Sequence, residues 1–216
     1  NNKEVIDECD LIYTLVATPS LEDGSYDVSA VWRVVTDFQD VTKRKYFVVG
    51  CTTNPGDCDN FRKQLPSNVK VFYNPEFIAQ GSIINDLRTA DMVLLGADPF
   101  ADNDKVISDI RTLYEKIQTT RAIVCSMSTT AAEITKIAIN CFLTTKISYA
   151  NMLGDVLHLS GCGDEVSGVL SAIGTDSRIG RKYLGYGFGY GGPCLPRDNR
   201  AFAAFAKNLG LEYNLG

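Results

Sequence analysis

The sequence is poor in the residues that metal sites and disulfide frameworks need. It has a single histidine, His158, among 216 residues, and its seven cysteines are scattered without a Cys-x-x-Cys pair. A structural zinc site therefore lacks its usual ligands, and an odd number of dispersed thiols is not typical of a disulfide framework. We expect no bound metal, and we expect most of the cysteines to be small buried apolar residues.

Long apolar runs and an excess of positive charge are also missing. The longest apolar runs, residues 11–17 and 92–97, are far shorter than the roughly eighteen residues that a membrane-spanning helix needs. The net charge is -5, so no strong basic field attracts nucleic acid. The chain does not open with a basic segment followed by an apolar targeting region. We expect a soluble, cytoplasmic protein that binds neither nucleic acid nor membranes.

The first half of the chain alternates short apolar runs with amphipathic stretches. Hydrophobic residues make up 45% of the sequence, enough for a sizeable core. The predicted strands are residues 11–18, 46–51, 69–73, 92–96 and 122–125, and the predicted helices are residues 28–41, 58–65 and 103–117. Strands that are apolar along their whole length, separated by helices, predict a parallel sheet covered on both faces.

The second half has a helical pattern. Residues 129–160 contain no proline and one glycine, and apolar residues recur every three or four positions, which predicts one long helix. Ser128, Thr129 and Thr130 with Glu133 offer a capping-box start, and glycines at 161 and 163 end the helix. Shorter helices follow at residues 165–173 and 196–209, on either side of a glycine-rich loop at 185–192. We therefore expect an α/β domain in residues 1–126 and an all-helical domain in residues 127–216.

The glycine-rich loop spells Gly-x-Gly-x-x-Gly at residues 187–192, but no strand leads into it, so it does not match a dinucleotide fingerprint. The residues after it are more informative. Cys194 stands at the start of the last helix, where unpaired amides and the helix dipole favour a thiolate. Asp198 lies one turn further on and could accept a proton or order a water molecule. Two readings of Cys194 stay open, a nucleophile and a residue that only packs.

Polar side chains recur on the long helix at Lys136, Asn140, Thr144 and Ser148. This stripe is either a solvated face or the lining of a polar site, in which a lysine and an amide on adjacent turns could stabilise an oxyanion.

Polar turns follow three of the predicted strands, at residues 18–19, 52–55 and 74–77, and the last of them carries Glu76. Ligands of open α/β sheets bind at the carboxyl ends of parallel strands, so these turns predict one crevice. The alternative for each turn alone is an ordinary cap.

Five motifs, in this order, resemble the UDP-glucose and GDP-mannose dehydrogenase family. They are Ala17-Thr18-Pro19; Asn74-Pro75-Glu76-Phe77 with Gly81; Ala132-Glu133-Ile134-Thr135-Lys136 with Asn140; Arg178-Ile179-Gly180; and Gly189-Tyr190-Gly191-Gly192-Pro193-Cys194 with Asp198. The resemblance covers nearly the whole chain. It implies a partial, doubly wound, Rossmann-like domain that binds NAD, and a four-electron oxidation of the C6 alcohol of a UDP-glucose-like nucleotide sugar to the uronic acid.

The resemblance also implies catalytic roles. Cys194 would hold the sugar first as a thiohemiacetal and then as a thioester. Lys136 and Asn140 would stabilise the oxyanion, and Asp198 would order water and assist proton transfer. Glu76 would be the acid/base of thioester hydrolysis.

Cofactor and substrate contacts are implied as well. Thr53 would lie beside the hydrolytic water and, with Thr18 and Pro19, would contact NAD. The implied substrate contacts are Phe77, Tyr183, Leu184, Gly189, Tyr190 and Gly191, together with Arg178 reaching the substrate of a partner subunit. The long helix would form the core of a homodimer.

Three positions depart from the family pattern. Gln80 stands where a second glutamate is usual, Pro193 where a serine is frequent, and Arg197 where a lysine is common. The family's glycine-rich pyrophosphate turn and its second α/β domain are not found in the sequence, so the isolated chain is expected to be inactive or altered. The alternatives are a hydroxyacid or phosphogluconate dehydrogenase, which has no use for Cys194, and a non-catalytic dimerising fragment or assembly module.

Overall fold

The computed structural model describes residues 1–78, 81–98 and 104–211. It forms two compact units, Asn1–Lys136 and Ile137–Gly216. The first turns of the long helix therefore belong to the first unit. The domain boundary expected near residue 126 stays a prediction.

The first unit is built on a five-stranded sheet in the order β1-β2-β3-β4-β5. Its strands are β1 (Leu11–Thr14), β2 (Lys45–Val49), β3 (Val69–Tyr73), β4 (Met92–Ala97) and β5 (Ile123–Ser128). The pairs β1–β2, β2–β3 and β4–β5 are parallel. The predicted α/β class with a Rossmann-like sheet is thus confirmed.

One junction of the sheet is not parallel, contrary to the prediction. β4 runs antiparallel to β3, and the two strands share a single register pair, Tyr73 with Gly96. A parallel connection needs a crossover of a dozen or more residues, usually a helix packed on the sheet. Between these strands the described helix is the six-residue α4 (Ile83–Arg88). α4 has no buried residue, so in the described part of this connection no helix packs on the sheet as a parallel crossover usually requires.

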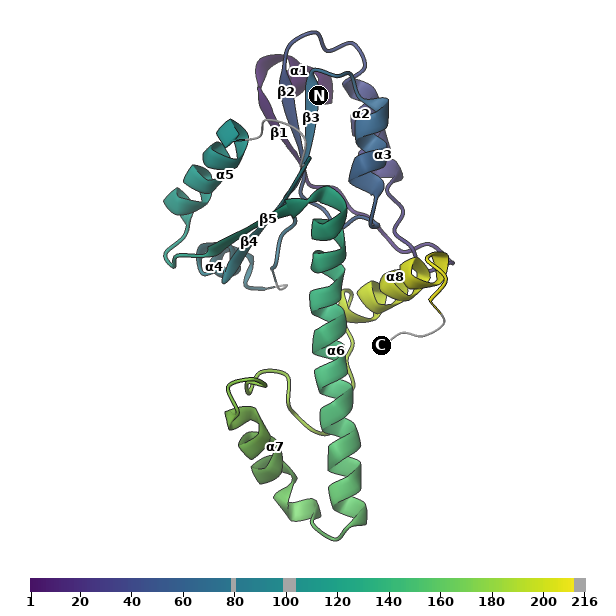
Figure 1. Ribbon diagram of the computed structural model, residues 1–216, viewed down its shortest axis with the longest axis vertical. Coiled ribbons are helices and arrows are strands. Elements are labelled where there is room, and N and C mark those ends of the chain that lie inside the picture. Colours follow the sequence, from purple (N-terminus) through teal and green to yellow (C-terminus); the bar gives the residue numbers. More distant parts are fainter. Residues whose placement is uncertain (79–80, 99–103, 212–216) are drawn as a thin grey trace. The chain divides into compact units, whose positions relative to one another are not determined.

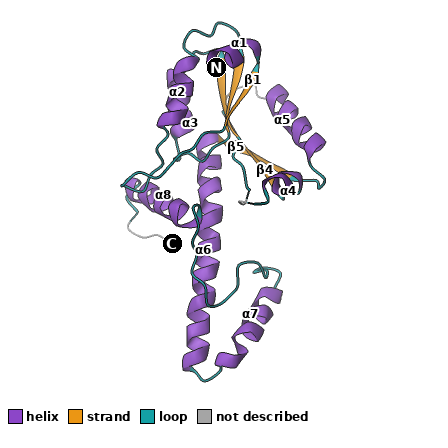
Figure 2. Cartoon of the chain, turned by 180° about the vertical axis from the view of Figure 1, so that it is seen from behind, coloured by secondary structure: helices purple, strands orange, loops and turns teal. Residues whose placement is uncertain are grey.

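Helices cover both faces of the sheet (Figures 1 and 2). They are α1 (Asn2–Glu8), α2 (Ser29–Asp37) and α3 (Asp57–Gln64) on one face, and α5 (Asp104–Ile117) on the other. Side chains alternate along β2 accordingly, because successive residues of a strand point to opposite faces. Phe47 and Val49 pack under α1–α3, whereas Val48 packs under α5. This two-sided burial explains why the inner part of β2 is apolar on both faces.

Two helices of the first unit, α1 and α4, were not predicted, because both are too short for a helical period to show. α1 begins with a capping box formed by Asn1 and Glu4. The buried ammonium group of Lys45 on β2 donates to the carbonyl oxygens of Asp7 (3.1 Å) and Cys9 (2.7 Å) at the C-terminal end of α1. A charged residue at the start of an apolar strand thus fastens this helix to the sheet.

The long helix is confirmed as α6 (Thr129–Leu159), and Gly161, with φ of +82°, follows its end. The second unit continues with a 3-10 turn at Gly163–Glu165, α7 (Val166–Thr175) and α8 (Leu195–Asn208). Ala150, Val166 and Leu170 form the buried core between α6 and α7. Leu184 and Tyr186, from the segment after α7, pack against this core.

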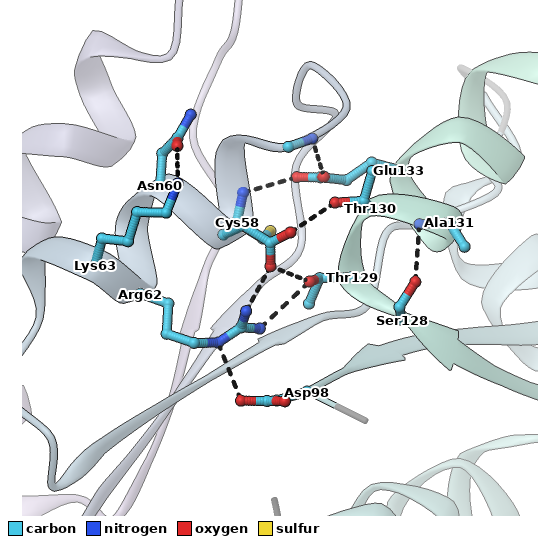
Figure 3. Close-up of polar contacts among 12 residues, drawn as sticks. Cys58, Asn60, Arg62, Lys63, Asp98, Ser128, Thr129, Thr130, Ala131 and Glu133 are labelled. Carbon is cyan, nitrogen blue, oxygen red and sulfur yellow. Dashed lines mark hydrogen bonds and ion pairs between the residues drawn. The ribbon is translucent and has the colours of Figure 1, made fainter. Parts of the chain in front are cut away.

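The predicted capping box of α6 is wrong in one half. The Ser128 hydroxyl accepts from the amide of Ala131 at 3.3 Å, as a cap should. Glu133, however, is fully buried and its carboxylate binds groups around the start of α3. Glu133 stands at the sequence position that a capping box requires, but its side chain makes tertiary contacts instead of capping α6 (Figure 3).

No helix in the described part of the chain is long and apolar enough to cross a membrane. The cytoplasmic location expected from the sequence stays a prediction.

Candidate active site

The carboxyl ends of β1 and β2 lie together, because Thr14 and Val49 are register partners. The turn after β1 is fastened to the turn after β2 by Thr18, whose hydroxyl donates to the carbonyl of Thr52 at 2.7 Å. Thr53 is fully buried, and its hydroxyl donates to Glu133 at 2.9 Å. Pro19 is exposed, and its carbonyl accepts from the amide of Asp27. Two of the three polar turns predicted from the sequence therefore meet.

The third turn, after β3, is held by Asn74. Its Oδ1 accepts from the phenol groups of Tyr13 (3.0 Å) and Tyr114 (2.9 Å), and its Nδ2 donates to the carbonyl of Leu94 (2.8 Å). Burial raises the pKa of both Tyr13 and Tyr114 above the ordinary value, so both phenols stay protonated donors. Asn74 thus sets the direction in which the chain leaves β3 toward Glu76.

Lys136 contacts this third turn. Its ammonium group donates to the carbonyl oxygen of Glu76 and lies 4.3 Å from the ring centroid of Phe77, a cation–π distance. The lysine and the two predicted site residues of the turn are therefore brought together. Gln80 lies outside the described residues.

Cys194 is exposed and is the N-cap residue of α8. Its carbonyl accepts the first helical hydrogen bond, from the amide of Asp198 at 2.9 Å. The sulfur atom therefore stands at the positive end of a fourteen-residue helix. This end of a helix stabilises negative charge, and an exposed thiolate there can attack an electrophile.

Asp198 is almost completely buried, at 1% exposure. Its Oδ2 accepts from the amide of Asn140 on α6 at 2.7 Å, and its Oδ1 lies 3.5 Å from Arg197 Nε. On the next turn, Thr144 is fully buried and bonds Asn199 of α8 at 2.9 Å. At these positions the polar stripe of α6 is thus a packed polar seam rather than a solvated face.

The segment between α7 and α8 carries the other predicted substrate residues. Tyr183 has a left-handed backbone, with φ of +64°, and Leu184 packs on the α6–α7 core. A left-handed non-glycine residue costs of order 1 kcal/mol or more and persists only where its surroundings enforce it. Tyr190 is half-buried, whereas Gly189 and Gly191 are exposed and have open space at the Cβ position.

Arg178 is exposed, and its guanidinium group pairs with Asp176 two residues earlier, at 2.6 Å. The pair keeps the charged group on the short turn after α7.

The predicted residues fall in both units. Thr18, Pro19, Thr53, Glu76, Phe77 and Lys136 belong to the first unit, and Asn140, Arg178, Tyr183, Leu184, Gly189, Tyr190, Gly191, Cys194 and Asp198 belong to the second. Sequence reasoning missed the tertiary roles of Asn74 and Glu133. Asn74 stood in a recognised motif but only as a turn residue, and Glu133 was read as a local cap.

Comparisons with known proteins identify the family of the chain. Residues 1–118 match the NAD binding domain of the UDP-glucose/GDP-mannose dehydrogenase family, and residues 130–215 match its central domain. A putative UDP-glucose 6-dehydrogenase of Bacillus subtilis is 34% identical over 95% of this chain and 49% of its own length. A UDP-glucose 6-dehydrogenase of Pseudomonas aeruginosa is 31% identical over 97% of this chain and 47% of its own length.

A solved structure gives the same picture. A UDP-glucose dehydrogenase from Pyrobaculum islandicum matches with a TM-score of 0.85 and 31% identity, over 98% of this chain and 49% of that chain. A 3-hydroxyisobutyrate dehydrogenase of Mycobacterium tuberculosis, at 14% identity and a TM-score of 0.70, shares the fold alone. The chain spans about half the length of the curated relatives it matches. It belongs to the UDP-glucose/GDP-mannose dehydrogenase family, of which it carries the NAD binding domain and the central domain.

Proposed function

We propose that the chain is the NAD-binding and cysteine-bearing part of a nucleotide-sugar 6-dehydrogenase, which oxidises the C6 alcohol of a UDP-glucose-like substrate to the uronic acid. In this proposal residues 1–126 bind the cofactor, and residues 127–216 supply the nucleophile and the dimer contact. The observation that carries it is Cys194, exposed at the N-terminus of α8, with the buried carboxylate of Asp198 one turn further on.

The chemistry has four steps. The C6 alcohol loses a proton and a hydride to become an aldehyde, and the Cys194 thiolate adds to the carbonyl carbon to form a thiohemiacetal. Loss of a second hydride forms a thioester, and attack by water releases the acid and regenerates the thiol. NAD, when bound, accepts the hydride in each of the two oxidations, so two molecules are used for each acid formed.

The surrounding groups have distinct tasks in this scheme. Lys136 and Asn140 on successive turns of α6 donate to the oxyanion, and Asp198 orders the water and moves a proton. Glu76 is the acid/base of thioester hydrolysis. The substrate contacts are Phe77, Tyr183, Leu184, Gly189, Tyr190 and Gly191, and Arg178 contacts the substrate of a partner subunit.

The strand ends that hold Thr18, Pro19 and Thr53 fit the nicotinamide part of NAD. Both threonine hydroxyls donate their protons inward, to the Thr52 carbonyl and the Glu133 carboxylate. Both threonine side chains are buried, so in this proposal a cofactor at these strand ends would first meet the exposed Pro19 and the backbone of the turns.

The exposed side chains of α6 support a homodimer through this helix. Phe142, Tyr149, Met152, Val156 and Leu159 are 65%, 46%, 54%, 52% and 90% exposed, respectively. Their spacing of seven, three, four and three residues places them on one face of a helix, as in a helix–helix seam. Sedimentation velocity should show a dimer that Met152→Glu dissociates, whereas Ile84→Glu, at a 70% exposed apolar site on α4, leaves it intact.

The test of the catalytic proposal uses the aldehyde of UDP-glucose, which probes the thiol without requiring the first oxidation. In a full-length protein that contains this chain, incubation with this aldehyde and NAD should produce NADH absorbance and a sugar adduct on the peptide that bears Cys194. Cys194→Ser should abolish both signals. The matched control is Cys9→Ser, which removes the other exposed thiol and should change neither signal.

If Cys194→Ser still made the acid at the normal rate, the covalent mechanism would be wrong. If the chain neither reduces NAD nor forms the adduct but dimerises, a non-catalytic dimerising module is the correct function.

A further inference from the structure

The segment between α7 and α8 runs along α6 and is docked on one face of that helix (Figures 1 and 2). The docking face consists of positions i, i+3, i+4 and i+7 of the helix, which are Asn151, Gly154, Asp155 and His158. The ring of Tyr186 lies over Gly154, where an added Cβ atom would stand 1.9 Å from it. The Tyr186 hydroxyl donates to Asp155 at 3.0 Å, and its ring centroid lies 5.3 Å from that of His158. The start of the glycine-rich loop is therefore attached to α6.

Asn151 makes the bonds from this face to the loop backbone. Its Oδ1 accepts from the amide of Gly187 at 2.9 Å, and its Nδ2 donates to the carbonyl oxygen of Phe188 at 2.9 Å. The bonds engage the peptide groups on either side of these two residues, so they fix the direction in which the chain continues. An asparagine side chain carries both the acceptor and the donor that this arrangement needs. Gly187 has φ of +102°, a conformation that glycine adopts without strain.

Residues 189–193 connect this point to Cys194. The three glycines of this span have open space at the Cβ position, so no neighbouring atom restricts them there. The far end of the span is fixed separately by α8, whose Asn199 donates to Thr144 of α6 at 2.9 Å. The path of the span therefore depends on where its two ends are held, and Asn151 holds the first end.

We propose that Asn151 is a positioning residue of the sugar site, which fixes the start of the span 189–193 and thereby sets where its backbone meets the sugar. The contact between this span and the sugar rests on the proposed function, whereas the hold of Asn151 on Gly187 and Phe188 does not. Asn151 touches no reacting atom in this role. The Cys194 thiol keeps its place at the N-terminus of α8 without it.

Tyr186 provides the matched control, because it contacts the same face through its side chain. Tyr186→Phe deletes the bond to Asp155 and leaves the ring over Gly154. Both bonds from Asn151 to the loop backbone remain. A difference between the two variants therefore measures the hold on the backbone rather than general contact with α6.

The first measurement is amide hydrogen exchange at Gly187, followed by nuclear magnetic resonance of the full chain. Asn151→Ala removes both bonds to the loop, and alanine is a better helix former than asparagine, so α6 is preserved. Exchange at Gly187 should rise about tenfold or more. Tyr186→Phe should raise it by less than about threefold.

The second measurement uses a full-length protein that contains this chain and compares two reagents for Cys194. The aldehyde of UDP-glucose depends on the loop to orient the sugar, whereas iodoacetamide does not. At low aldehyde concentration, Asn151→Ala should slow adduct formation about tenfold, and at saturation by less than about twofold. Alkylation of Cys194 by iodoacetamide should change by less than about twofold. Tyr186→Phe should change either rate by less than about twofold.

Each outcome decides the proposal. Unchanged exchange at Gly187 in Asn151→Ala would show that Asn151 does not hold the loop. An equal fall in adduct formation and alkylation, or equal effects of Asn151→Ala and Tyr186→Phe, would leave Asn151 with a purely structural role.

Two further outcomes are distinguishable from these. Should Asn151→Ala not fold, Asn151→Asp replaces it, because it keeps the acceptor for Gly187 and loses the donor to Phe188. The same split between the two reagents is then expected, and its absence overturns the proposal. If the unaltered full-length protein forms no adduct, the proposed function fails, and exchange at Gly187 alone decides whether Asn151 holds the loop.

Discussion

Replacement of Gly154 by alanine should detach the glycine-rich loop from α6. A Cβ atom at Gly154 would lie 1.9 Å from Cδ2 and 2.3 Å from Cε2 of Tyr186, so the ring must leave. The Tyr186 hydroxyl donates to Asp155, and its ring lies 5.3 Å from that of His158. Since the next residue, Gly187, is bound through its amide to Asn151 at 2.9 Å, displacement of the ring also pulls on this contact.

The magnitude follows from these contacts. A half-buried ring contributes about 1 kcal/mol, and hydrogen bonds contribute about 1 kcal/mol each. Asn151 makes two such bonds to the loop, the second to the carbonyl of Phe188. Alanine in a helix interior recovers about 1 kcal/mol relative to glycine. We expect Gly154→Ala to lower the free energy of unfolding of the second unit by about 2 kcal/mol.

The assay is urea unfolding followed by circular dichroism at 222 nm, with Gly168→Ala as the matched control. Gly168 lies inside α7, and a Cβ there would meet nothing within 4 Å. The control should therefore stabilise the protein by about 0.5–1 kcal/mol. If both variants are stabilised alike, Tyr186 does not occupy the surface of Gly154, and the anchoring of the loop described above is wrong.

Three further predictions concern the carboxyl group of Glu133, the ammonium group of Lys45 and the thiol of Cys194. Because burial raises the pKa of Glu133 from its ordinary value of 4.5 to about 7, the folded protein holds an extra proton between these values. The free energy of unfolding should therefore fall by up to about 3 kcal/mol as the pH rises from 4.5 to 7, and urea titrations of Glu133→Gln should lack this component. Lys45→Met should lower the free energy of unfolding by about 2 kcal/mol, because the carbonyls of Asp7 and Cys9 lose their hydrogen-bond donor. The control, Lys43→Met at an exposed site, should change thermal unfolding little. Iodoacetamide should modify Cys194 first and the exposed Cys9 second. Cys51, Cys58 and Cys141 should react later, because burial raises the pKa of these three thiols. Peptide mapping that finds Cys9 modified before Cys194 would contradict the proposed effect of the helix N-terminus on Cys194.

Local patterns predicted most of the elements. The long helix α6 could be read from a stretch without proline and with one glycine, and the strands β2, β3 and β4 from short apolar runs. β5 runs three residues beyond its prediction, because its last residues, Ser126 to Ser128, are polar or flexible types with little strand signal. The direction of β4 depends on how the chain crosses the sheet, which no local pattern records.

The site was harder to predict, for a related reason. Cys194 could be singled out because its flanking glycines and prolines mark a helix start, a local property. The bond between Glu133 and Thr53 joins residues 80 positions apart, and nothing near Glu133 distinguishes a buried carboxylate from a cap. The burial of Asp198 likewise depends on Asn140, 58 positions earlier.

The antiparallel junction between β3 and β4 has a consequence for folding. β4 and β5 pair along six residues, whereas β4 joins the other three strands at the single register pair Tyr73 and Gly96, and α5 packs on Val48 and Phe72 of those strands. The buried bond from Asn74 Nδ2 to the carbonyl of Leu94 crosses the same junction, so a side-chain amide takes the place of part of the missing ladder. The backbone ladder of the sheet is therefore weakest at this junction, where side chains supply much of the contact. Hydrogen exchange at residues along this junction should begin before exchange inside either parallel ladder, so that the turn carrying Glu76 is released by partial opening of the sheet rather than by global unfolding.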